Sequence, residues 1–121
     1  MHPKEEFKTM GVTIYHNPKC SKSRQTLQIL EDKGVAPEIV LYLETPPTAD
    51  EMKELLKKLG LRAADILRQA EAREAGLSGD MDEDALIKGM IAHPRCIERP
   101  IVVKGAKAVL GRPPENVLDL I

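Results

Sequence analysis

A strand pattern that runs directly into a cysteine-containing loop and then a helix constrains the fold of this chain most. The run VTIYH at 12–16 predicts a buried strand, and the turn-rich NPKCSKS that follows predicts a loop. A helix is expected from about Ser23, with Gly34 as its left-handed stop, and EIVLYL at 38–43 predicts a second strand. A β-α-β unit of this kind requires a parallel strand pair joined by a crossover helix.

The middle of the chain has helical periodicity. Thr48 and Glu51 form a capping box that predicts a helix ending at Gly60. Further helices are expected over roughly 62–70 and 83–92. This helical stretch therefore separates the N-terminal β-α-β unit from the C-terminal region.

The C-terminal region predicts a hairpin and a helix. Strands are expected at 101–104 and 107–110, separated by two residues, and Pro113 with Pro114 opens a last helix. The order β-α-β, helices, β-β-α predicts an α/β thioredoxin-like fold with a mixed β-sheet and a helical insertion.

Length and charge narrow the function classes. The 121 residues suit one domain, expected at 10–121 after a flexible N-terminal leader at 1–9. A net charge of −1 and 2% aromatic residues argue against a nucleic-acid partner. No apolar run is long enough to span a membrane, so a membrane partner is not expected either. Two cysteines and the absence of a signal-peptide pattern predict a cytoplasmic protein with reduced thiols.

Cys20 is the candidate reactive residue of this chain. It lies between a strand end and a helix start, where free backbone N–H groups favour a thiolate. Lys19, Lys22 and Arg24 flank it, and residues 10–30 contain no acidic side chain. Cationic neighbours lower the pKa of a thiol, so Cys20 is expected to be reactive, with Arg24 among the groups that stabilise its thiolate.

Spacing limits the kind of thiol chemistry. Ser23 occupies the position at which a thioredoxin-type centre has its second cysteine, so Cys20 needs an external thiol or the distant Cys96 to complete a redox cycle. Thr26 occupies the position, six residues after Cys20, at which the phosphate-binding loop of a phosphatase would have an arginine, so that type of loop is not predicted. Cys96 is expected to be a passive, partly buried residue, although a resolving role stays open.

Metal binding is not expected. A zinc site built from His16, Cys20, His93 and Cys96 would lack the close paired spacing of structural zinc sites. Arginines are the better candidate ligands, since the planar guanidinium suits tetrahedral oxyanions, and Arg99 and Arg112 flank the predicted hairpin. The isomer of the Arg99–Pro100 bond is left open by the sequence.

The chain resembles a known family from about Val12 to its C-terminus. The motifs that carry the resemblance are YHNPKCSKSRQTL, LYLETPPT, ADILR, ERPIVV and GRPPENVLDL. They are similar to those of the glutaredoxin-coupled arsenate reductase family, the ArsC-like branch of the thioredoxin-like fold, and particularly to its compact chromosomal members. The family loop often has Gly-Thr after the cysteine, where this chain has Ser21-Lys22.

The resemblance implies an arsenate reductase with assigned roles. Cys20 would attack arsenate, Arg68, Arg99 and Arg112 would bind the oxyanion, and His16 would help to lower the thiol pKa. Glutathione would be a co-substrate and glutaredoxin a partner that together resolve the Cys20–arsenic adduct, with no tightly bound cofactor.

Two other functions fit the same fold. A glutathione-dependent thiol oxidoreductase without arsenate activity would need Cys20 but not all three arginines. An Spx-like transcriptional regulator would bind RNA polymerase, but such proteins commonly sense oxidation through a CxxC pair, which Ser23 interrupts.

Overall fold

The computed structural model describes residues 11–121, so the predicted leader at 1–9 lies outside the described residues. The chain forms two compact units. The sheet unit comprises the described residues up to Leu41 together with Arg99–Ile121, and the helical unit comprises Tyr42–Glu98. The prediction of a single domain over 10–121 stays a prediction. Within residues 11–121, no helix has the length and apolar character needed to cross a bilayer.

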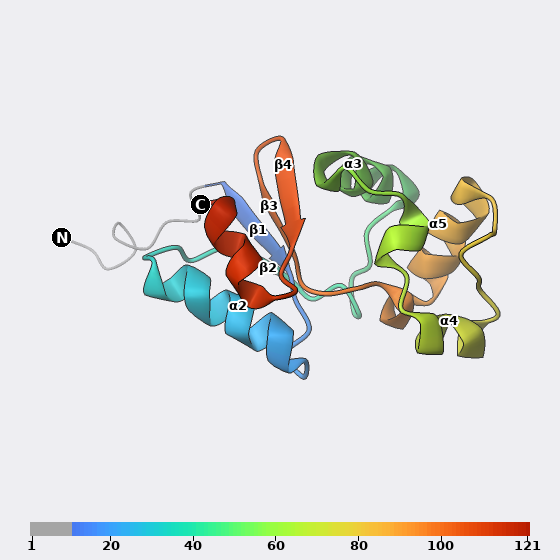
Figure 1. The fold of residues 1–121 in the computed structure, drawn as a ribbon, viewed down its shortest axis with the longest axis horizontal. Helices are drawn as coiled ribbons and strands as arrows, with labels where there is room; N and C mark the ends of the chain where they lie inside the picture. The colour runs from blue at the N-terminus through green and yellow to red at the C-terminus, as the bar shows by residue number, and fades with distance from the viewer. Residues whose placement is uncertain (1–10) are drawn as a thin grey trace. The chain divides into compact units, whose positions relative to one another are not determined.

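The sheet unit is built on four strands (Figure 1). They are β1 (Val12–Tyr15), β2 (Glu38–Val40), β3 (Ile101–Lys104) and β4 (Lys107–Leu110), in the spatial order β2-β1-β3-β4. β1 pairs in parallel with β2 and antiparallel with β3, and β3 pairs antiparallel with β4. The predicted α/β architecture with a mixed sheet is therefore confirmed.

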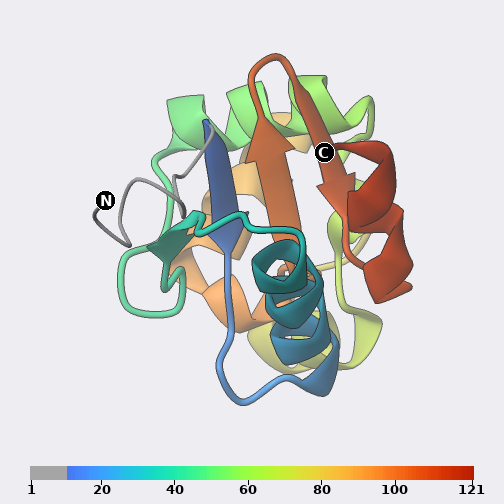
Figure 2. The same cartoon turned by 90° about the vertical axis from the view of Figure 1, so that its left-hand side faces the viewer.

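Two helices lie on one face of this sheet (Figure 2). They are α2 (Ser21–Asp32) and the 3₁₀ helix η3 (Pro114–Asp119), which pack against each other. The core between helices and sheet is aliphatic, and its buried members are Val12, Ile14, Leu30, Val35, Val102 and Val117. Burial of these side chains fixes α2, and with it the cysteine loop, against the sheet.

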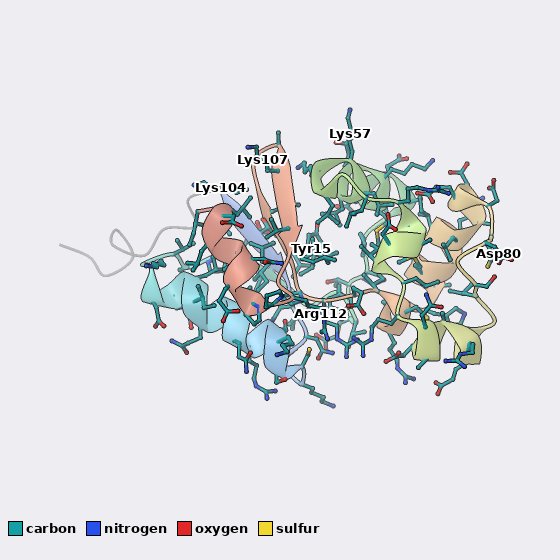
Figure 3. The ribbon with its side chains drawn as sticks, viewed as in Figure 1. Tyr15, Lys57, Asp80, Lys104, Lys107 and Arg112 are labelled. Atoms are coloured by element: carbon teal, nitrogen blue, oxygen red, sulfur yellow. The ribbon has the colours of Figure 1, made fainter. Side chains whose placement is uncertain are left out.

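The β3–β4 hairpin brings two candidate ligands to the same end of the sheet. Ile101 pairs with Leu110, so Arg99 just before β3 and Arg112 just after β4 are neighbours in space. In Figure 3, Arg112 lies at the end of the hairpin opposite Lys104 and Lys107. The tight turn at that far end uses Gly105 with φ 61°, a conformation that glycine adopts without steric cost.

The helical unit contains three α-helices and two 3₁₀ turns. In chain order they are α3 (Ala49–Leu59), η1 (Ala63–Ile66), α4 (Gln69–Ala75), α5 (Glu83–Ala92) and η2 (Pro94–Cys96). The predicted capping box is confirmed, because Thr48 accepts from the Glu51 amide while the Glu51 carboxylate accepts from the Thr48 amide.

The helix predicted over 62–70 is wrong. Leu67 instead forms a β-bridge with Ile97, and the Arg68 amide donates to the Cys96 carbonyl at 2.8 Å. This long-range pairing, together with burial of Leu67, outweighs helix propensity, so the segment splits into η1 and α4 with an extended Arg68 between them.

Two further elements differ from expectation. The strand predicted at 38–43 ends at Val40, whose carbonyl accepts a last bond from the His16 amide at 2.9 Å, just past the end of its partner β1 at Tyr15. The last helix is a 3₁₀ helix, with the Asn116 side chain bonded to the carbonyls of Leu110 and Arg112.

Candidate active site

Cys20 is the N-cap residue of α2 and has an extended backbone, with φ −94° and ψ 124°. Its amide donates to the Asn17 carbonyl at 3.0 Å, and its own carbonyl accepts the first helical bond from the Arg24 amide at 3.0 Å. These two bonds fix the loop on one side and the helix on the other. The thiol is partly exposed and takes the place that a capping oxygen occupies in other helices.

The electrostatics around Cys20 favour the thiolate. Partial burial opposes ionisation, but it is outweighed by hydrogen bonds from the Ser23 amide, the Arg99 side chain and the Lys22 amide, and by the Arg99 charge. The pKa of the Cys20 thiol therefore lies below its ordinary value. A thiolate is the nucleophilic form of cysteine, so this site is suited to attack on an electrophile.

His16 contacts the serine that takes the place of a second cysteine. Its Nδ1 lies 2.6 Å from the Ser23 Oγ, and the Asn17 amide donates to the same oxygen at 3.0 Å. Burial, aided by the Arg24 charge, lowers the pKa of His16 below 6.5 and favours a neutral imidazole, with Glu31 acting in the opposite direction. His16 thus holds Ser23, whose amide in turn binds the Cys20 sulfur.

The Arg24 side chain also contacts the cysteine loop. Its Nη1 donates to the Pro18 carbonyl at 2.9 Å, and the side chain is exposed. This contact holds the loop at the first turn of α2. The thiolate-stabilising roles of Arg24 and His16 stay predictions.

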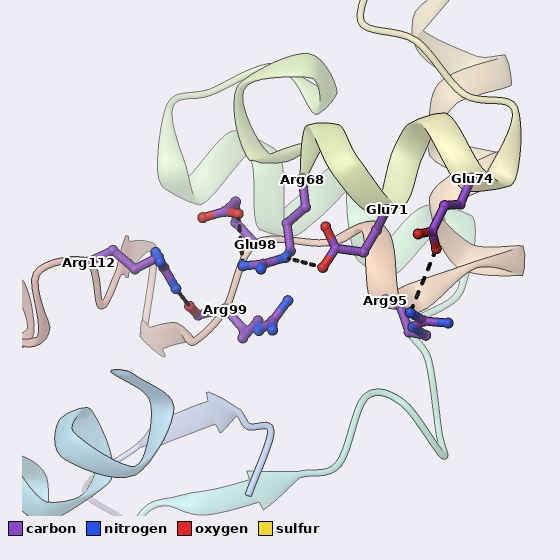
Figure 4. A network of polar contacts seen from close by, with 7 residues as sticks. All are labelled: Arg68, Glu71, Glu74, Arg95, Glu98, Arg99 and Arg112. Carbon is purple, nitrogen blue, oxygen red and sulfur yellow. Dashed lines mark hydrogen bonds and ion pairs between the residues drawn. The ribbon is translucent and has the colours of Figure 1, made fainter. Parts of the chain in front are cut away.

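Arg99 and Arg112 form a connected pair in the sheet unit. The Arg112 Nη1 donates to the Arg99 carbonyl at 3.3 Å, drawn as a dashed line in Figure 4, while the Arg99 side chain lowers the pKa of the Cys20 thiol. The Arg99 Nε is buried and has no hydrogen-bond acceptor among residues 11–121. A buried donor of this kind is suited to bind an oxygen of a small anion beside the thiol.

Arg68 belongs to the helical unit, where it lies between two carboxylates (Figure 4). Its Nε donates to Glu71 at 3.1 Å and its Nη1 to Glu98 at 3.3 Å. These bonds use two of the five N–H donors of the guanidinium and hold it in one orientation. Glu71 is recognisable from its i+3 spacing on α4, whereas no local signal in the sequence indicates Glu98.

Cys96 is buried, with 1% of its surface exposed. Burial raises the pKa of its thiol, and the Glu71 and Glu74 charges add to this effect against that of Arg95. The predicted buried position is therefore confirmed. Within residues 11–121, no group of three or more His, Cys, Asp or Glu side chains is arranged to hold a metal ion.

A mixed sheet in the order β2-β1-β3-β4, with Cys20 at the N-terminus of α2, is typical of a thioredoxin-like fold. More narrowly, the chain belongs to the ArsC family, whose model matches residues 15–120.

Relatives and solved structures cover most of the chain. It is 50% identical over 117 residues to the uncharacterized protein YfgD of Escherichia coli K12, covering 93% of this chain and 98% of that protein. It is 44% identical over 110 residues to an arsenate reductase of Neisseria meningitidis, covering 88% and 94%. The structure of an arsenate reductase from Vibrio cholerae is 45% identical, has a TM-score of 0.83, and matches over 95% of this chain and 98% of that one.

Proposed function

We propose that this protein is an arsenate reductase that uses Cys20 as its nucleophile and glutathione with glutaredoxin as its reductants. The observation that carries the proposal is the Arg99 side chain, which lowers the pKa of the Cys20 thiol and has a buried Nε without an acceptor among residues 11–121. The arsenate reductases at 44–45% identity support the same substrate.

The first step is formation of a thiol–arsenic adduct. The Cys20 thiolate attacks the arsenic atom, and one arsenate oxygen leaves as water after taking up two protons. Arg99 and Arg112 offset the anionic charge of the oxyanion in the sheet unit, and Arg68 is the third arginine ligand. Arsenic remains As(V) in this step, because no electrons have yet been transferred.

Reduction follows from external thiols. A glutathione thiol adds to the arsenic of the adduct and displaces a second oxygen as water. A glutaredoxin thiol then attacks the glutathione sulfur, forming a mixed disulfide, and the two electrons of the broken As–S bond reduce arsenic to As(III). Water releases arsenite and regenerates the Cys20 thiol. The borrowed thiols fit Ser23, which leaves no local partner for a Cys20 disulfide.

This chemistry needs no tightly bound cofactor. The cytoplasm, where glutathione is kept reduced, is the compartment in which we place the reaction. Arsenate, glutathione and glutaredoxin are then the only partners that turnover requires.

The test is NADPH consumption in an assay coupled through glutathione, glutaredoxin and glutathione reductase. We expect arsenate-dependent oxidation that is lost in Cys20→Ser and strongly reduced in Arg99→Ala. Arg73→Ala is the matched control, because Arg73 is an exposed arginine of α4 outside the proposed site. Arsenate-independent consumption, or equal effects of the two arginine variants, would refute the proposal; the former would favour a general thiol oxidoreductase.

A further inference from the structure

The segment that carries Arg112 crosses α2 at unusually close range. Gly111 is buried, and a Cβ built on it would lie 2.5 Å from the Thr26 Oγ1, 3.0 Å from the Thr26 Cγ2 and 2.7 Å from the Pro100 Cγ. Atoms of other residues essentially never come within 3.0 Å of a Cβ, so a side chain at Gly111 would force Thr26 or Pro100 to shift.

The elements that meet at Gly111 are those that carry the reactive groups. Thr26 is fully buried on α2, six residues after Cys20. At a rise of about 1.5 Å per residue, it is about 9 Å along the helix from the thiol. Pro100 is bonded directly to Arg99, and the Gly111 amide donates to the Pro100 carbonyl at 2.9 Å.

These contacts form a closed ring. From Cys20, helix α2 leads to Thr26, whose Oγ1 lies 3.4 Å from the Gly111 carbonyl. Gly111 precedes Arg112, which donates to the Arg99 carbonyl, and the Arg99 side chain acts on Cys20 by lowering the pKa of its thiol. Gly111 therefore contacts both the helix that carries Cys20 and the segment that carries Arg99.

We infer that Gly111 is a positioning residue for the active site, and that its missing side chain sets the distance between the Arg99 guanidinium and Cys20. The effect of Gly111 on the reactivity of the Cys20 thiol does not depend on the proposed function. Its effect on arsenate turnover rests on that function. Gly111 has no positive φ, so alanine is sterically tolerated by the backbone and only the contacts with Thr26 and Pro100 oppose it.

The test is the pH profile of Cys20 alkylation by iodoacetamide, measured in a Cys96→Ser background. We expect Gly111→Ala to move the profile to higher pH and to slow alkylation severalfold at neutral pH. Val35→Ala is the control for simple destabilisation, because Val35 belongs to the buried core of the sheet unit and lies beyond the other end of α2 from Cys20. An unchanged profile in Gly111→Ala, or an equal shift in Val35→Ala, would overturn the inference.

A double variant tests the contact itself. Thr26→Ala removes the two Thr26 atoms nearest the added Cβ, so Gly111→Ala/Thr26→Ala should recover part of the lost reactivity. If Gly111→Ala does not fold, the double variant is compared with Thr26→Ala alone, from which it differs by one methyl group against Pro100. We expect slower alkylation in the double variant, and equal rates would contradict the inference. A wild-type protein that fails to reduce arsenate would refute the proposed function and leave these comparisons intact.

Discussion

The His16 Nδ1 and the Ser23 Oγ lie 2.6 Å apart and join the end of β1 to the first turn of α2. Both side chains are buried, and the Ser23 oxygen also accepts the Asn17 amide. Ser23, at the position where dithiol centres have a second cysteine, therefore makes a structural polar contact that supports the Cys20 loop.

Ser23→Ala should lower the free energy of unfolding by about 1–3 kcal/mol. The variant leaves the Asn17 amide and the His16 ring without the buried oxygen that they share, and an unsatisfied buried polar group costs that order of free energy. Urea denaturation measures the change. Ser21→Ala, at an exposed serine of the same helical turn, is the matched control and should be nearly neutral. Equal losses in the two variants would contradict this role.

Acid should destabilise the protein through His16. Its pKa is lowered below 6.5, mainly by burial, so the unfolded chain binds a proton in a pH range where the folded chain does not. Stability is therefore fully present above pH 6.5 and falls as the pH drops toward the folded pKa. Unfolding free energies measured on either side of pH 6.5 should show a smaller decrease in His16→Gln than in wild type. An unchanged pH slope in the variant would rule out His16 as the source.

Arg99→Gln should raise the pKa of the Cys20 thiol, because the substitution removes a charged hydrogen-bond partner of the sulfur. The thiolate absorbance measured against pH gives the titration curve. Arg24→Gln is the informative comparison, since Arg24 binds the Pro18 carbonyl and is not among the groups that shift the Cys20 pKa in the structure. A larger shift in Arg24→Gln than in Arg99→Gln would contradict this expectation and support the role predicted for Arg24 from its sequence position.

Arg68→Gln should lower kcat/KM for arsenate by about tenfold or more. A charge-assisted hydrogen bond contributes roughly 1.5–3 kcal/mol, and tenfold corresponds to about 1.4 kcal/mol. Because Arg68 also pairs with Glu71 and Glu98, thermal denaturation must be measured alongside turnover. Loss of stability with normal kcat/KM would make Arg68 a structural residue of the helical unit.

Cys96→Ser should keep most of the turnover. The thiol is 1% exposed and its pKa is raised, chiefly by burial, so it is a poor nucleophile at neutral pH. Kinetic measurement of the variant in the coupled assay tests this. A loss comparable to that of Cys20→Ser would identify Cys96 as the resolving thiol.

Local signals in the sequence were sufficient for much of the fold. The capping box at Thr48 and Glu51 and the hairpin around Gly105 depend on neighbouring residues, and the structure confirms both. Cys20 was also predicted correctly at the boundary between loop and helix, because turn residues precede it and helical periodicity follows it.

Features that depend on distant partners were not predictable in this way. Leu67 leaves the expected helix to pair with Ile97, thirty positions away in sequence. The bond between Arg68 and Glu98 and the contact of Gly111 with Thr26 likewise join residues that are far apart in sequence. Each depends on the packing of segments that meet only once the chain has folded.

The short strand β2 has a consequence for self-association. It is an outer strand of the sheet, and its Ile39 is 47% exposed, which would make a longer strand a template for pairing with other chains. β2 spans only three residues, follows Pro37 directly and begins with the exposed Glu38. Few backbone groups, an adjoining proline and a negative charge all discourage edge-to-edge aggregation, so the sheet is protected against growing at its β2 edge.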